Sequence, residues 1–305
     1  MRWNSYSVLL ILVTISSRLA LSQGFAIYKI QSDGSGQKQV TSLPEVIRLN
    51  GLALSPDSTH IAWGMTVVKN GVRDAGVYVV GSNGKDLHEL PLPPGILGLS
   101  NPAFSQDGKK LLVSELDSRG HQTISLENLD GSNRTLVVTD GISPNFNGDG
   151  SKIVFNRESL GSSVSEIVIC DSDGKNEHIL ATDALKGGLA GPMFNPADSN
   201  QVIYRADRKG QIILASINIK SGAIADAIPS SPPGYVAMST NGKLAVYERS
   251  IPNHNRPSLF LAELGATDGT PITHDDSVAF SYPQLSLDGK IIICFEYRGS
   301  QASLD

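Results

Sequence analysis

The sequence predicts an all-β fold made of one repeated unit, and three observations predict it. Two kinds of tight turn alternate along the chain, and short apolar, strand-like runs lie on both sides of each turn. Turns of one kind recur about every 46 residues between Asp57 and Asp288, a period typical of four-stranded propeller blades. No stretch has the periodicity of a long amphipathic helix. We therefore expect a six-bladed β-propeller with four antiparallel strands in each blade.

The first kind of turn is best preserved at Ser105–Gly108. Ser or Asn at the first turn position accepts a local backbone hydrogen bond, and Gly at the end adopts a positive φ without steric cost. An apolar residue precedes each copy, and an aliphatic run such as "LLV" or "IVF" follows it. The six copies are Ser55–Ser58, Ser105–Gly108, Asn147–Gly150, Asn195–Asp198, Ser239–Gly242 and Ser286–Gly289.

The second kind of turn is an Asp, Asn or Ser followed by Gly, which indicates a β-hairpin when strand-like runs flank it. Its copies are Asp33-Gly34, Asn83-Gly84, Asp130-Gly131, Asp173-Gly174, Ser221-Gly222 and Asp268-Gly269. Together the two kinds give twelve hairpins. The first hairpin (Phe25–Thr41) is of the second kind and the last (Ser281–Tyr297) is of the first kind, so each is half a blade. We expect these N- and C-terminal hairpins to pair and form a shared closing blade.

A proline precedes the first kind of turn at the same place in four copies, namely Pro102, Pro144, Pro192 and Pro283. Proline has no N–H to donate, so it is suited to a strand with a free edge. The innermost strand of a blade has such an edge. Leu52 and Val236 take this place in the other two copies.

The N-terminus has the pattern of a secretory signal peptide. Arg2 gives a positive start, Val8–Ile15 is an apolar run, and "ALSQ" at Ala20–Gln23 is a small-x-small cleavage pattern. The apolar run is too short for an uncleaved spanning anchor. We expect residues 1–22 to be removed after Ser22, leaving 23–305 as one propeller domain that is periplasmic or secreted.

Composition limits the partners. The formal net charge of −5 disfavours nucleic acid and anionic membranes, which attract basic surfaces. The chain has two cysteines, Cys170 and Cys294, each in an apolar run. They are either a disulfide or two buried thiols; because they fall in different blades, we expect buried thiols. We also expect a monomer that is not embedded in a membrane.

The blade motif resembles that of the TolB-like propellers, a WD-repeat-like family. The resemblance rests on Pro102–Val113, Pro283–Ile293, the Arg-Gly pairs at 119–120 and 298–299, and "IVICDSDGKNEHIL" at Ile167–Leu180. It covers almost all of residues 23–305. The family contains binding proteins, peptidase lids and sugar-processing enzymes, so the resemblance implies the fold and an extracytoplasmic role in bacteria rather than one chemistry.

Longer links, opposite the tight turns, are the expected place for a ligand site. They are rich in arginine, a residue that binds carboxylates through paired hydrogen bonds. Acidic residues accompany these arginines, so a solvated, self-neutralised loop set is the alternative. The crossing link with "HDD" is a further small candidate site. The candidate ligand-binding residues are Arg119, Arg157, Arg205, Arg249, Arg298, His274 and Asp275.

Motifs of catalysis are lacking in the sequence. It has no G-x-S-x-G elbow, no HExxH and no glycine-rich phosphate loop. We expect no metal and no cofactor, and a non-enzymatic protein that binds a protein or a cell-envelope polymer through its long-loop face. The alternative is a lyase of acidic sugars; some lyases with this type of blade use a histidine-built metal site, for which His121, His254 and His274 would be the ligands.

Overall fold

The computed structural model describes residues 24–43, 46–158, 164–186, 191–208, 211–228, 234–239, 243–250, 256–263, 266, 269–273 and 278–298. Within these residues, twenty-four strands form and no helix. The expected signal peptide, residues 1–22, lies outside them. In the part of the chain described, no helix has the length and apolar character needed to cross a membrane.

The strands pair into four sheets of four, eight, eight and four strands. Each eight-stranded sheet consists of two four-stranded units that pair only at Ala75↔Gly98 or at Ala184↔Ala206, and we call the resulting units blades 1 to 5 and the closing blade. Blade 1 is β3 (Arg48–Leu54), β4 (His60–Lys69), β5 (Val72–Gly81) and β6 (His88–Glu89). Blade 2 is β7 (Ile96–Phe104), β8 (Lys110–Asp117), β9 (Gln122–Asn128) and β10 (Thr135–Val138). Blade 3 is β11 (Ile142–Phe146), β12 (Lys152–Glu158), β13 (Ser165–Asp171) and β14 (His178–Ala184).

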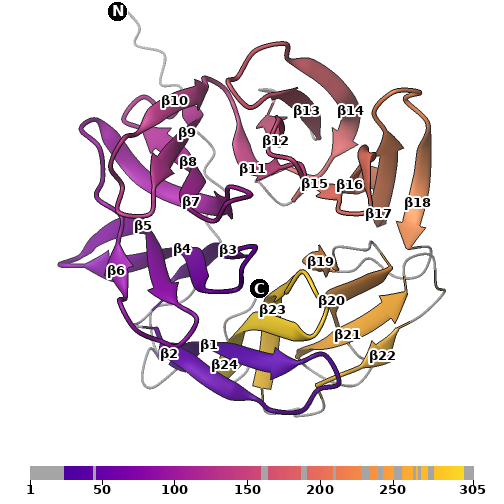
Figure 1. Cartoon of the computed structure of the whole chain (residues 1–305). Helices are drawn as coiled ribbons and strands as arrows, with labels where there is room; N and C mark the ends of the chain where they lie inside the picture. Colours follow the sequence, from indigo (N-terminus) through magenta and orange to yellow (C-terminus); the bar gives the residue numbers. More distant parts are fainter. Residues whose placement is uncertain are drawn as a thin grey trace, which may run out of the picture.

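Blade 4 is β15 (Met193–Asn195), β16 (Asp198–Arg208), β17 (Gln211–Asn218) and β18 (Ile224–Ile228). Blade 5 is β19 (Val236–Met238), β20 (Leu244–Ser250), β21 (Pro257–Glu263) and β22 (Thr270–Pro271). The blades surround a central axis, with β3, β7, β11, β15, β19 and β23 innermost (Figure 1). The all-β propeller predicted from the alternating turns is confirmed.

The closing blade combines both ends of the chain, as expected. Its order is β23 (Val278–Leu285), β24 (Ile291–Arg298), β1 (Gly24–Gln31) and β2 (Lys38–Ser42). β1 and β24 pair antiparallel from Gly24↔Arg298 to Gln31↔Ile291, and they lie side by side in Figure 1. Backbone hydrogen bonds between the first and last strands therefore hold the ring closed.

Side-chain bonds within the tight turns explain why Ser and Asp recur there. In the turn between β7 and β8, the Ser105 hydroxyl donates to Asp107 (2.7 Å) and accepts from the Lys110 backbone N–H (3.0 Å). Ser286 makes the same pair of bonds with Asp288 and the Ile291 N–H. Each hydroxyl thus satisfies a backbone donor at the start of the second strand of its blade.

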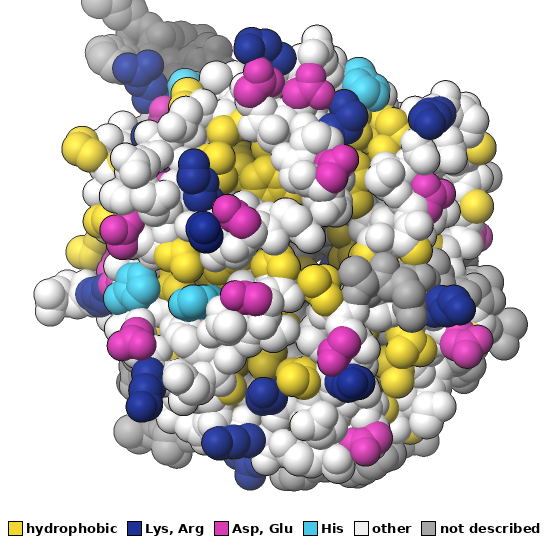
Figure 2. Space-filling view, in the orientation of Figure 1, with side chains coloured by type: hydrophobic (Ala, Val, Ile, Leu, Met, Phe, Trp, Pro, Cys, Tyr) yellow, Lys and Arg dark blue, Asp and Glu magenta, His cyan; other side chains and the backbone are white. Residues whose placement is uncertain are grey.

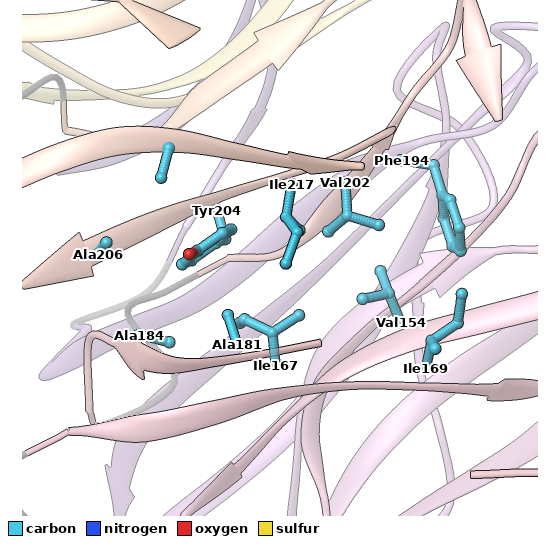
Figure 3. Close-up of a cluster of buried hydrophobic side chains, with 11 residues drawn as sticks. Val154, Ile167, Ile169, Ala181, Ala184, Phe194, Val202, Tyr204, Ala206 and Ile217 are labelled. Atoms are coloured by element: carbon cyan, nitrogen blue, oxygen red, sulfur yellow. The ribbon is translucent and has the colours of Figure 1, made fainter. Parts of the chain in front are cut away.

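The core lies between neighbouring blades. Val154 and Ile167 of blade 3 pack against Val202 and Tyr204 of blade 4 (Figure 3). Full burial of an aliphatic side chain of this size contributes about 1.5–3 kcal/mol relative to exposure. A single blade has no partner for these faces, so the blades are stable only as a ring.

Both cysteines are free and buried, as expected. Cys170 lies in β13 and Cys294 in β24, and burial raises the pKa of both thiols, that of Cys170 to about 12.

Candidate functional site

One small pocket lies on the propeller axis, because residues from all six blades line it. Its volume is about 110 Å³. We call it the axial pocket. The innermost strands and the residues just before them contribute one equivalent residue from each blade: Gly51, Asn101, Ser143, Gly191, Tyr235 and Tyr282. The recurrent prolines Pro102, Pro144 and Pro192 line it as well.

The residues of this ring share an unusual backbone conformation. Among them, φ is positive at Gly51 (92°), Asn101 (47°), Ser143 (55°), Gly191 (51°) and Tyr282 (52°). The strand pairing shifts register at this place in β3, β7, β11 and β23. Left-handed backbone costs little for Gly and Asn but about 1–3 kcal/mol for a bulky residue such as Tyr. The surroundings of Tyr282 must therefore hold it in place.

Tyr235 and Tyr282 form a stacked pair at one side of the axial pocket. Their ring centroids are 3.6 Å apart and the rings are inclined by 22°. The two hydroxyls are hydrogen-bonded to each other (2.7 Å), and the Tyr282 hydroxyl also donates to the Leu49 carbonyl (3.0 Å). Burial raises the pKa of both phenols, so both remain neutral at physiological pH. The pair links blade 5, the closing blade and blade 1.

Glu248 in β20 supports the tyrosine pair from behind. Its Oε1 accepts the Tyr235 backbone N–H (2.9 Å), and its carboxylate also accepts the Tyr282 backbone N–H. Burial raises the pKa of Glu248 to about 7, while these two donors and the charge of Arg205 oppose the rise. Gly234 must be glycine, because a Cβ there would overlap the Glu248 side chain.

Arg205 supplies the positive charge of the axial pocket. It lies in β16, near the link to β17, and lines the pocket. Its guanidinium carbon is 5.4 Å from the centroid of the Tyr235 ring, a cation–π distance. The pocket therefore offers a guanidinium next to an aromatic surface, an arrangement that can bind a carboxylate together with its apolar stem.

Of the five predicted arginines, only Arg205 reaches the axial pocket. Arg119 is exposed in the turn between β8 and β9. Arg157 pairs through its Nη2 with Glu177 (2.5 Å) and lies 3.6 Å from Asp140.

The guanidinium of Arg249 lies 4.0 Å from the centre of the Phe260 ring, and Arg298 Nε pairs with Glu296 (2.5 Å). The structure therefore does not bring the five arginines together. On the face shown in Figure 2, Lys and Arg side chains are mixed with Asp and Glu, and hydrophobic side chains surround the centre. His274 and Asp275 lie outside the described residues.

Tyr235, Tyr282 and Glu248 were not among the site residues predicted from the sequence. A signal was present at the position before the recurrent proline, or before Leu52 and Val236 in the two copies without proline. This position is Gly, Asn or Ser in four copies and Tyr in the other two. No local pattern marked Glu248, which contacts Tyr235 in its own blade and Tyr282 in the neighbouring closing blade.

No group of three or more His, Cys, Asp or Glu side chains in the described part of the chain is placed to hold a metal ion. His121 lies beside Asp117 (3.1 Å) in an exposed turn, and His254 lies outside the described residues.

No protein family model matches the sequence, and no curated protein matches it. Solved structures do match. TolB from Agrobacterium tumefaciens superposes with a TM-score of 0.70 at 16% identity, over 92% of this chain and 100% of that one. The chain has a TolB-like propeller fold. TolB from Acinetobacter baumannii matches with a TM-score of 0.59 at 19% identity, over 92% of this chain and 64% of that one.

The TolB-like fold is shared with an enzyme. Oligogalacturonate lyase from Vibrio parahaemolyticus matches with a TM-score of 0.57 at 14% identity, over 88% of this chain and 81% of that one. At these identities the similarity concerns the fold alone.

Proposed function

We propose that the protein is an exported, non-enzymatic propeller that binds a protein partner through its long-loop face. An acidic side chain of the partner enters the axial pocket and pairs with Arg205. The size and chemistry of the pocket carry this proposal. Its volume of about 110 Å³ holds one side chain and lies below the range of roughly 300–1,000 Å³ typical of small-molecule sites.

The neighbouring groups support the same function. The Tyr235–Tyr282 pair presents a rigid aromatic surface, and Tyr and Arg are enriched among residues that dominate protein interfaces. Because Glu248 and the hydroxyl bonds hold both tyrosines, binding costs little side-chain entropy. A cell-envelope polymer with carboxylates is the second partner class that fits Arg205.

The expected signal peptide and the TolB-like fold support a periplasmic location. The protein acts as a monomer, with the partner bound to the long-loop face.

The test is capture of partners from envelope extract, followed by titration of the identified partner. We expect Arg205→Ala to weaken binding about tenfold or more, because a charge-assisted bond is lost. Arg119→Ala, which removes an exposed arginine outside the pocket, is the matched control and should leave affinity unchanged. Equal affinity of both variants and the wild type would refute the role of the axial pocket.

A second candidate is a lyase of acidic sugars, favoured by the structural similarity to oligogalacturonate lyase. A solved oligogalacturonate lyase is a complex with manganese, and the described residues here offer no set of ligands for such an ion. We therefore derive no metal-assisted step; Arg205 would bind the uronate carboxylate. Release of unsaturated products from polygalacturonate, with or without added Mn²⁺ and lost in Arg205→Ala, would replace the binding proposal with this one.

A further inference from the structure

A second and larger cavity lies between the closing blade and blade 1. Its volume is about 600 Å³, within the range of small-molecule sites. It shares no lining residue with the axial pocket. The main wall residues are Leu43, Trp63, Met65, Val67, Tyr78 and Leu87. We call this cavity the lateral cavity.

The walls of the lateral cavity are mostly apolar and aromatic. The rings of Trp63 and Tyr78 are stacked, with centroids 5.7 Å apart and an inclination of 19°. Met65 and Val67 extend this surface along β4, and both are buried in the core between the two blades. Val68 lines the cavity too, but 54% of it is exposed. The cavity is therefore open to solvent at one end and apolar inside.

One wall residue of the lateral cavity, Trp63, carries a buried hydrogen-bond donor without a partner among the described residues. Trp63 is 1% exposed, and its indole Nε1 makes no hydrogen bond to any described residue. Buried donors of this kind are rare, because leaving one unpaired costs about 1–3 kcal/mol. A ligand oxygen that accepts the Trp63 N–H would remove this cost.

Lys69, His88 and Glu89 also line the lateral cavity, and the charges there disfavour an anionic ligand. Lys69 contacts two carboxylates, with its Nζ 2.6 Å from Asp74 and 3.1 Å from Glu89. One positive charge thus lies between two negative charges. The hydrogen bonds to both carboxylates raise the pKa of Lys69, so Lys69 stays protonated and paired with Asp74 and Glu89. The ring nitrogens of His88 lie within hydrogen-bond distance of the carbonyl oxygens of Asp86 and Leu129.

We propose that the lateral cavity binds a neutral, largely apolar aromatic small molecule that carries a carbonyl or ether oxygen. Its ring system packs against Trp63 and Tyr78, and its oxygen accepts the Trp63 N–H. This site is independent of the partner binding proposed for the axial pocket.

Nile red is a suitable probe, because it is neutral, aromatic and carries a carbonyl oxygen. The chain has two tryptophans, Trp3 and Trp63. Trp3 lies in the expected signal peptide, so its removal with residues 1–22, or Trp3→Phe in the uncleaved chain, leaves Trp63 as the sole indole reporter. In this background we expect saturable Nile red binding with one site per chain. Blue-shifted dye emission and quenching of Trp63 fluorescence should follow the same curve.

Two matched variants test the location. Val68 and Val72 are exposed valines of the same hairpin, 54% and 68% exposed, and only Val68 lines the cavity. Val68→Phe should narrow the opening and weaken Nile red binding about tenfold, the equivalent of about 1.4 kcal/mol. Val72→Phe should leave it unchanged. Equal effects of the two substitutions would overturn the assignment.

Trp63→Phe tests the hydrogen bond. With dye emission as the readout, the substitution should weaken the binding of Nile red about fivefold, as expected for the loss of one hydrogen bond. The substitution should not weaken the binding of N-phenyl-1-naphthylamine, an apolar dye without oxygen. Equal losses for both dyes would overturn the role of the N–H. Tighter binding of the anionic dye 1-anilinonaphthalene-8-sulfonate than of Nile red would overturn the ligand class.

Discussion

Glu127 in β9 offers a sharp test of how burial governs the energetics of this propeller. It is 1% exposed, and neither carboxylate oxygen has a hydrogen-bond partner among the described residues. Glu115, on the adjacent strand β8, already pairs with Arg134. Burial, with the negative charge of Glu115 adding to it, raises the pKa of Glu127 to about 7.

The sign of the pH dependence follows from this shift. The folded protein holds the proton of Glu127 more tightly than the unfolded chain, whose carboxyl has a pKa of 4.5. Folding is therefore penalised increasingly as pH rises from 4.5 to 7, and the penalty is complete above 7. A shift of this size corresponds to about 3 kcal/mol at pH 8 and to less than about 1 kcal/mol at pH 5.

We expect Glu127→Gln to raise the free energy of unfolding by up to about 3 kcal/mol at pH 8 and by less than about 1 kcal/mol at pH 5. Urea denaturation at both pH values measures the difference. Glu263→Gln, at an exposed carboxyl of β21, is the control and should change little at either pH. If Glu127→Gln destabilises the protein equally at pH 5 and pH 8, the carboxylate has a stabilising partner and the reasoning is wrong.

Three further predictions concern the core, one turn and the ring closure. Because burial raises the pKa of the Cys170 and Cys294 thiols, a thiol reagent should label neither until denaturant is added; labelling in native buffer would contradict this. Gly174→Ala should cost about 2 kcal/mol, because φ is +81° and a Cβ would overlap a carbonyl of β10. Thermal unfolding should show a smaller loss for Gly222→Ala, where φ is +68° but nothing lies within 4 Å. Ile27→Ala, at a fully buried position of β1, should cost about 2–5 kcal/mol in urea denaturation, and a loss below 1 kcal/mol would mean that β1 contributes little to closure.

Much of the fold could be predicted from the sequence, because its signals are local and repeated. Turns such as Ser105–Gly108 carry their own hydrogen bonds, so the same residues mark the same bend in each blade. The closing blade followed from the hairpin order alone, and the pairing of β1 with β24 confirmed it.

The candidate site was less accessible to such reasoning, because its contacts cross between blades. In the sequence, Arg205 is one arginine among several. Its position over the Tyr235 ring distinguishes it from Arg157, which pairs with Glu177. Glu248 belongs to one blade but binds the backbone of the next through Tyr282. Contacts of this kind depend on the curvature of the ring, which no local pattern encodes.

The pairing of β1 with β24 also determines when the ring can close during synthesis of the chain. β1 emerges from the ribosome first, but its partner strand follows only after residue 290. At about 5–20 residues per second, the N-terminal hairpin waits on the order of tens of seconds with one edge open. An open edge can recruit strands from other chains. The edge of β1 that will pair with β24 is therefore exposed to such strand exchange until the C-terminal strand is made.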